Sequence, residues 1–186
     1  GKVDSKFGVA IETGQAEVFV ASAAMCANVK VCGYHCHVGS QVFDEEGSVY
    51  TDAAKIMFTF MAEMNEKYFL NADMLNMGGG YGVRYVESDP YVDIPANIRK
   101  VAQFVKNLAA ELKVPMPKIL MEPGRSIVAD AGMTLYTVGT VKKIPGYKNY
   151  ASIDGGMTDN PRYALYESKY TVLLANRMEE EKTFTC

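Results

Sequence analysis

The sequence has few cysteines, no long apolar run and no surplus of positive charge. Its 186 residues carry a formal net charge of −3, so the composition does not favour a nucleic-acid partner. No apolar run approaches the roughly twenty residues of a membrane helix, and no basic-then-apolar signal segment opens the sequence. We therefore expect neither membrane nor nucleic acid as a partner. The 48% of apolar residues suffices for one sizeable core.

The cysteines are spaced without the regularity of a disulfide framework, which favours a reducing cytoplasm; they are Cys26, Cys32, Cys36 and Cys186. Two of them lie near two histidines, a grouping that raises the question of zinc. On a strand, Cys32 and Cys36 face one side, whereas His35 and His37 face the other. Because this splits the ligands across the sheet, we expect no metal site.

Apolar runs alternate with helical periodicity over the first 130 residues. We expect strands at 7–11, 29–38, 72–77 and 119–121, and helices at 13–28, 48–68 and from Asp93 to before Pro115. This β-α-β-α-β-α-β order predicts parallel strands with helical crossovers. Half of an eight-stranded α/β barrel and one doubly wound sheet both fit.

The three expected helices each carry an apolar stripe. The first, capped by Thr13, has Val18, Ala21, Ser22 and Met25; the second, capped by Ser48, has Val49, Ala53, Ile56, Phe60 and Met64; the third has Ile94, Ile98, Val101, Val105, Leu108 and Leu112.

The pattern changes near residue 130. Beyond it, segments rich in β-branched and aromatic residues at 133–144, 150–153, 170–175 and 183–186 predict mostly antiparallel strands. We therefore expect two domains, 1–130 and 131–186.

A cluster of glycines, Gly78-Gly79-Gly80-Tyr81-Gly82, follows the third expected strand. Without side chains, the backbone can turn sharply and direct several N–H groups at one bound anion, most often a phosphate. A plain tight turn after a strand is the other interpretation. Context decides between them, because the neighbouring strands also end in residues that suit a site.

The second expected strand leads to His37 and Ser40, and the fourth to Glu122 and Arg125. Ligands of parallel α/β proteins bind at this carboxyl edge, and barrels often hold a phosphate at the loops after the last two strands. His37 fits a core position or stacking on a planar cofactor. Ser40 fits a helix cap or a loop position, or a hydroxyl that donates a hydrogen bond to a phosphate. A buried Glu122 needs a partner, either Arg125 or a protonated ring nitrogen. Arg125 and Arg162 together suit a substrate with carboxylates.

Four segments together resemble the diaminopimelate decarboxylase family of pyridoxal-phosphate enzymes, built on an alanine-racemase-like barrel and a β domain; they are His35–Gln41, Gly78–Gly82, Glu122–Arg125 and Asp154–Arg162. The ornithine and arginine decarboxylases share the first three kinds of element. The Asn160-Pro161-Arg162 element with Tyr166 points to the diaminopimelate branch.

The resemblance implies a role for each site residue. His37 would stack on the pyridine ring, and Glu122 would pair with its nitrogen; these two are the catalytic candidates. The cofactor candidates are His37, Ser40, Gly78, Gly79, Gly80, Glu122, Pro123, Gly124 and Arg125. The substrate candidates are Arg125, Arg162 and Tyr166.

The implied activity is a carbon–carbon lyase of lysine biosynthesis, a cytoplasmic homodimer that converts meso-2,6-diaminopimelate to L-lysine. A decarboxylase of the ornithine or arginine type is the alternative, as is a non-catalytic half-barrel that binds phosphate or dimerises. The family's Schiff-base lysine motif is absent. We therefore expect a fragment that comprises the second half of the barrel and the start of the β domain, and that is inactive alone.

Overall fold

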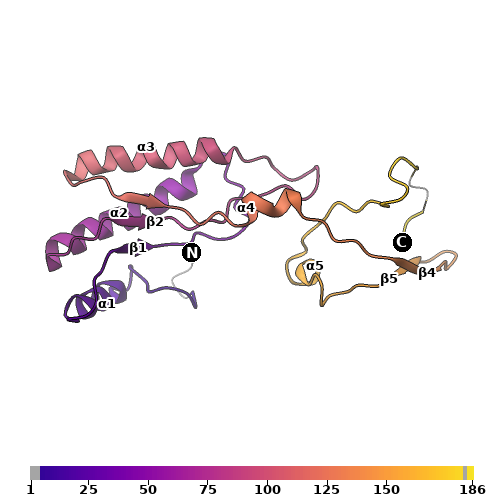
Figure 1. Ribbon diagram of the computed structural model, residues 1–186, viewed down its shortest axis with the longest axis horizontal. Helices are drawn as coiled ribbons and strands as arrows, with labels where there is room; N and C mark the ends of the chain where they lie inside the picture. Colours follow the sequence, from indigo (N-terminus) through magenta and orange to yellow (C-terminus); the bar gives the residue numbers. More distant parts are fainter. Residues whose placement is uncertain (1–4, 182–183) are drawn as a thin grey trace. The chain divides into compact units, whose positions relative to one another are not determined.

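The computed structural model describes residues 5–181 and 184–186. Contacts divide the chain into two compact units (Figure 1). The first contains the chain up to Val83 together with Pro90–Asp130, and the second contains Arg84–Asp89 and Ala131–Cys186. No helix among the described residues is long and apolar enough to cross a membrane.

A three-stranded parallel sheet organises the first unit. Its strands are β1 (Gly33–His35), β2 (Met74–Asn76) and β3 (Lys118–Leu120), in the order β1-β2-β3. In register, Asn76 at the end of β2 lies between His35 of β1 and Leu120 of β3. The parallel α/β arrangement predicted from the sequence is therefore confirmed, and the three strands end at one edge.

The strand predicted at residues 7–11 is wrong. The carbonyl of Ala10 accepts hydrogen bonds from the Ala16 N–H (3.0 Å) and the Thr13 hydroxyl (3.4 Å), and the carbonyl of Ile11 accepts one from the Gly14 N–H (2.9 Å). These carbonyls close the turn into the first helix, so they are not available to a neighbouring strand.

Three helices accompany the sheet, α1 (Gln15–Ala24), α2 (Ser48–Tyr68) and α3 (Ile94–Leu112), and α2 and α3 lie side by side (Figure 1). α3 begins as predicted, because the Asp93 carboxylate accepts the N–H of Ala96 at 2.8 Å. α2 also has its predicted bounds, but its N-cap is Gly47. The capping carboxylate comes from Asp44, which accepts the N–H groups of Gly47 (3.0 Å) and Val49 (2.7 Å).

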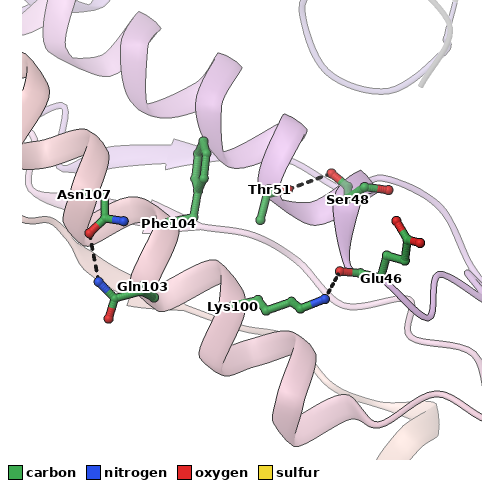
Figure 2. Close-up of a pocket in the computed structure, with 7 residues that line it drawn as sticks. All are labelled: Glu46, Ser48, Thr51, Lys100, Gln103, Phe104 and Asn107. Carbon is green, nitrogen blue, oxygen red and sulfur yellow. Dashed lines mark hydrogen bonds between the residues drawn. The ribbon is translucent and has the colours of Figure 1, made fainter.

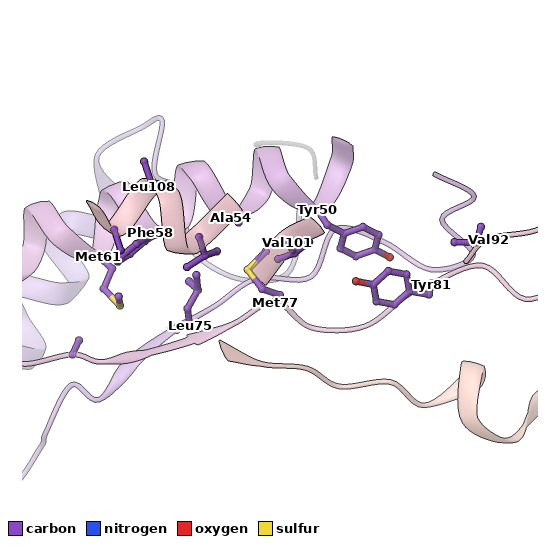
Figure 3. Packing of buried hydrophobic residues seen from close by; sticks show 13 residues of the cluster. Tyr50, Ala54, Phe58, Met61, Leu75, Met77, Tyr81, Val92, Val101 and Leu108 are labelled. Carbon is purple, nitrogen blue, oxygen red and sulfur yellow. The ribbon is translucent and has the colours of Figure 1, made fainter. Parts of the chain in front are cut away.

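The core lies between the sheet and these helices (Figure 3), where Leu75 and Met77 from the β2 segment are fully buried. α3 contributes its predicted Val101, Val105 and Leu108. On α2 the predicted face is wrong in part: Phe60 and Met64 are buried, but Val49 and Ile56 are exposed, and the stripe facing the sheet is Tyr50, Ala54, Phe58 and Met61.

α1 also turns a different face inward from the predicted one. It buries Ala16 and Val20 against Phe60 and Met64 of α2, whereas Val18 and Met25 are exposed. It is shorter than predicted at both ends, and Gly14 rather than Thr13 is its N-cap.

The second unit contains an antiparallel pair, β4 (Val138–Lys142) and β5 (Tyr150–Ile153), interrupted by a register shift between Val138 and Val141. The prediction of antiparallel strands in these two segments is confirmed. The strand predicted at 170–175 is wrong: Tyr170 packs edge-on against Tyr85, and the Thr171 hydroxyl donates to the Tyr85 carbonyl at 2.7 Å.

Of the strand predicted at 183–186, residue 183 lies outside the described residues and 184–186 form no strand. The remaining elements are short, namely α4 (Arg125–Val128) and the 3₁₀ turn η1 (Ala129–Ala131) at the end of the parallel region, and α5 (Arg162–Tyr166) in the second unit.

Candidate functional site

Three loops meet at the carboxyl edge of the parallel sheet. They follow β1, β2 and β3 and carry, in that order, His37, the glycine cluster and Glu122. Adjacent loops are joined by backbone hydrogen bonds, because the Val42 N–H donates to the Gly80 carbonyl (2.9 Å) and the Glu122 N–H donates to the Gly78 carbonyl (2.7 Å). The glycine cluster is therefore the central loop of the three.

Glycine at three consecutive positions is what lets these loops touch. A Cβ on Gly78 would lie 2.6 Å from the Cys36 carbonyl oxygen, and one on Gly80 would lie 1.8 Å from that of Gly39. On the other side, a Cβ on Gly79 would lie 2.2 Å from the carbonyl oxygen of Glu122. Gly78 and Gly80 also have φ of +67° and +91°, a region that other residues rarely adopt. The cluster is thus more than a plain turn.

The imidazole of His37 lies against the glycine turn. A Cβ on Gly78 would meet its Nδ1 at 3.1 Å, and a Cβ on Gly80 would meet its Cε1 at 3.4 Å. His37 is nevertheless exposed, so it is not a core histidine. One side of its ring lies against the backbone of Gly78 and Gly80, and the exposed remainder is open to a ligand.

Glu122 is not buried, contrary to the prediction: its side chain is 56% exposed. Its carboxylate has two described neighbours, and Arg125 is neither of them. Oε1 accepts a hydrogen bond from Asn76 Nδ2 at 2.8 Å, and Oε2 lies 3.6 Å from His35 Nε2. Both neighbours come from the ends of adjacent strands.

The other predicted residues of the first unit lie in the same loops. Ser40 is exposed and precedes Gln41, whose side-chain amide exchanges two 3.0 Å hydrogen bonds with the backbone of Val83. Pro123 follows Glu122, and Gly124 is the N-cap of α4, where an added Cβ would meet nothing within 4 Å. Arg125 is half-buried at the first position of α4.

Arg162 and Tyr166 belong to the second unit, at the two ends of α5. The Arg162 guanidinium lies over the ring of Tyr85, 5.5 Å from its centroid, and NH2 donates to the Ser168 hydroxyl at 3.4 Å. Tyr166 is exposed. Within its unit, Arg162 is thus held by an aromatic ring and a hydroxyl.

Tyr50 and Tyr81, to which the sequence analysis assigned no role, pack in the core against the glycine turn. Their rings stack at 4.2 Å between centroids, and the Tyr50 hydroxyl donates to the Gly79 carbonyl at 3.4 Å. Burial raises the pKa of Tyr81 to about 12, and burial with the nearby Tyr81 and Asp44 raises the pKa of Tyr50 further. Both phenols therefore stay neutral and act as packing and hydrogen-bonding groups.

Sequence reasoning also assigned no role beside Glu122 to His35 or Asn76. A signal for Asn76 was present, because it is a polar residue at the carboxyl end of an otherwise apolar strand.

An open groove of about 590 Å³ lies elsewhere on the first unit, between the start of α2 and the middle of α3 (Figure 2). Its lining residues are Glu46, Ser48, Thr51, Lys100, Gln103, Phe104 and Asn107. Among the lining residues only Glu46 belongs to one of the three strand-end loops, at the α2 end of the loop after β1, and no candidate site residue lines the groove.

The fold and the site define a parallel α/β domain of the barrel type, with its functional groups at the carboxyl ends of the strands. The chain belongs to the pyridoxal-dependent decarboxylase family, since the family model described as "Pyridoxal-dependent decarboxylase, pyridoxal binding domain" matches residues 1–129. The α/β barrel class predicted from the sequence is confirmed by this match and by the similarity to solved structures.

Among curated relatives, the chain is 42% identical over 180 residues to the diaminopimelate decarboxylase of Bacillus subtilis (strain 168). It is also 42% identical over 180 residues to that of Staphylococcus aureus (strain COL). Each match covers 97% of this chain, but 40% and 41% of the relative, respectively. The chain thus spans about two fifths of the length of these relatives.

Among solved structures, the chain resembles a diaminopimelate decarboxylase of M. jannaschii in co-complex with L-lysine. The TM-score is 0.78 at 32% identity, over 90% of this chain and 37% of the other. A lysine/ornithine decarboxylase from Vibrio vulnificus complexed with cadaverine has a TM-score of 0.72 over 92% of this chain and 43% of the other. At 23% identity this second similarity shows the fold alone.

Proposed function

We propose that the three loops form part of a site for pyridoxal 5'-phosphate. The observation that carries the proposal is the convergence of His37, the glycine turn and Glu122 on one edge of the sheet. Bound there, the cofactor would supply an electron sink for the carbanion left by decarboxylation. His37 would stack on the ring, and the Glu122 carboxylate would hold a proton on its nitrogen, because an opposite charge stabilises the protonated form.

The groups of the glycine turn fit a phosphate. Among the described residues, the backbone N–H groups of Gly79 and Gly80 donate to no protein acceptor, although Gly79 is buried. A buried N–H without a partner is costly, and a phosphate oxygen is a strong acceptor for it. The proposed phosphate-binding site would be completed by Ser40, Gly78, Gly124 and Arg125. Pro123 would shape the loop. Arg125 would also reach the substrate.

For the whole protein we propose decarboxylation of meso-2,6-diaminopimelate to L-lysine. The names of the 42%-identical relatives and the lysine co-complex at 32% identity support this substrate over ornithine or arginine. Arg162 and Tyr166 would hold the far end of the substrate, where a guanidinium can grip a carboxylate with two parallel hydrogen bonds. The contact of Arg162 with Tyr85 and Ser168 would preset its orientation.

Residues 1–130 would form part of the cofactor barrel and 131–186 part of a β domain, in a cytoplasmic homodimer. The free state of all four cysteines is compatible with a reducing compartment.

The test uses the gene product that carries this chain, supplied with pyridoxal phosphate. We expect carbon dioxide release from meso-2,6-diaminopimelate but not from ornithine or arginine. Glu122→Gln should lower kcat by roughly 10²–10³-fold, since it removes a charge placed for the reaction, while Glu111→Gln on the exposed face of α3 should not.

Arg162→Ala should raise KM for meso-2,6-diaminopimelate. An unchanged KM, combined with turnover of ornithine, would instead favour the ornithine-type activity. Failure of the wild-type protein to bind the cofactor at all would end the proposal.

A further inference from the structure

We propose that Asn76 is a positioning residue that holds the Glu122 carboxylate in place for the ring nitrogen. The inference rests on the proposed function, because it concerns how the same site presents its acid. Asn76 was not among the residues expected from the sequence, and it contacts Glu122 directly from the last position of β2.

Three hydrogen bonds join Asn76, Gly78 and Glu122 into a closed ring. Asn76 Oδ1 accepts the Gly78 N–H at 2.9 Å, and the Gly78 carbonyl accepts the Glu122 N–H at 2.7 Å. The ring closes where Asn76 Nδ2 donates to Glu122 Oε1 at 2.8 Å. The glycine turn and the acid are therefore fixed to the same amide.

Only a side chain with both a donor and an acceptor can make these two bonds at once. An aspartate at position 76 could still accept the Gly78 N–H, but it would face the Glu122 carboxylate with like charge and no donor. A serine could not span the distance to Oε1. The amide is thus required by chemistry as well as by length.

The consequence for Glu122 is conformational. At 56% exposure its side chain is not confined by packing, so the hydrogen bond from Asn76 is what selects one rotamer. Because Asn76 occupies Oε1, the remaining oxygen, Oε2, is the one that we assign to the ring nitrogen. His35, with its Nε2 at 3.6 Å, lies on that side.

The experiment uses the gene product that carries this chain, loaded with pyridoxal phosphate labelled with ¹⁵N in the ring. The ¹⁵N chemical shift reports whether the ring nitrogen is protonated, and it does not depend on how much of the enzyme is folded or loaded. The variants are Asn76→Asp, Asn76→Ser and Glu122→Gln, with Asn71→Asp as a control that makes the same charge change on an exposed residue outside the ring of hydrogen bonds.

We expect both Asn76 variants to move the ¹⁵N signal toward the unprotonated position, in the direction of Glu122→Gln, and Asn71→Asp to leave it unchanged. We also expect kcat to fall by roughly 10- to 100-fold with a smaller change in KM, the loss expected for one hydrogen bond to a charged group. In the Glu122→Gln background, the Asn76 variants should add little, because both act through the same carboxylate.

The outcomes separate the inference from the proposed function. A signal that moves in Glu122→Gln but not in Asn76→Ser or Asn76→Asp overturns the inference and leaves the proposed function standing. If Asn76→Asp does not fold, the uncharged Asn76→Ser decides alone. A bound cofactor whose signal ignores Glu122→Gln overturns the role of Glu122, and the inference with it.

Discussion

The close approach of the glycine turn to its neighbours makes a quantitative prediction for alanine substitutions. An alanine at one of these positions would be subject to two separable effects. One is the strain of a positive φ, and the other is the overlap of the added Cβ with neighbouring backbone. Gly14 has φ of +76° and open space around its Cβ position, so it isolates the first effect. Gly79 has no positive φ but would place its Cβ 2.2 Å from the Glu122 carbonyl oxygen, so it isolates the second. Gly80 combines both, with φ of +91° and a 1.8 Å overlap with the Gly39 carbonyl oxygen.

The expected losses in free energy of unfolding follow this division. Gly14→Ala should cost about 1 kcal/mol, because the left-handed conformation costs about 1–2 kcal/mol and the stiffer unfolded chain returns part of that. Gly79→Ala should cost about 3 kcal/mol, the upper end of overpacking, since a backbone oxygen cannot rotate away as a side chain can. Gly80→Ala should cost about 4 kcal/mol, near the sum of the two effects.

Urea unfolding followed by far-ultraviolet circular dichroism measures these losses, and the pyridoxal phosphate affinity of each folded variant is measured in parallel. Gly79→Ala and Gly80→Ala should weaken binding, whereas Gly14→Ala should not. The reasoning is refuted if Gly79→Ala is no more costly than Gly14→Ala, because the loops would then not need the glycine to touch.

Three further predictions concern helix capping, pH and buried phenols. Asp44→Ala should lower the free energy of unfolding by about 1–2 kcal/mol through loss of the α2 cap, and Asp52→Ala, on the exposed side of the same helix, should change it little; urea titration compares them. Hydrogen bonds from Lys67 and Tyr68 lower the pKa of the Glu17 carboxyl below 4.5, so the stability it contributes is present above that pH and lost as the pH falls through the folded-state pKa. Lys67→Met should therefore flatten the acid side of a stability–pH curve, and an unaltered slope would contradict the pairing. In a tyrosinate absorbance titration, Tyr81→Phe should remove intensity only near pH 12, where burial places the pKa of Tyr81; a loss of intensity well below that pH would show that the phenol is accessible.

Local signals in the sequence were sufficient where the determinant is local. Asp93 and Pro95 fixed the start of α3, because a carboxylate cap and a proline in the first turn act within one turn of helix. The periodicity of residues 48–68 predicted the bounds of α2, although the side chain that caps the helix is that of Asp44 and not that of Ser48. The spacing of elements was enough for a parallel sheet, and hence for placing His37, Gly79 and Glu122 in loops on one edge.

The faces of α1 and α2 could not be derived in the same way. Their apolar residues extend around more than one face, and which side is buried depends on the partner that the fold supplies. α1 packs against Phe60 and Met64, so Ala16 and Val20 point inward, whereas Val18, equally apolar, remains in solvent. The run at residues 7–11 was apolar enough for a strand, but its carbonyls are used by the turn into α1.

The sequence by itself determined the chemistry available to this protein: an imidazole, an acid and a glycine turn, each following a strand. Only the tertiary structure decided their geometry, since contacts between residues some forty positions apart depend on strand register. That register brings Asn76 between His35 and Leu120 and gives the exposed Glu122 an amide partner instead of Arg125. The packing of α2 on the sheet brings the Tyr50 hydroxyl within hydrogen-bonding distance of the Gly79 carbonyl. A hydrogen bond of 2.8 Å requires alignment of two strands and a loop, and no pattern within a single segment encodes it.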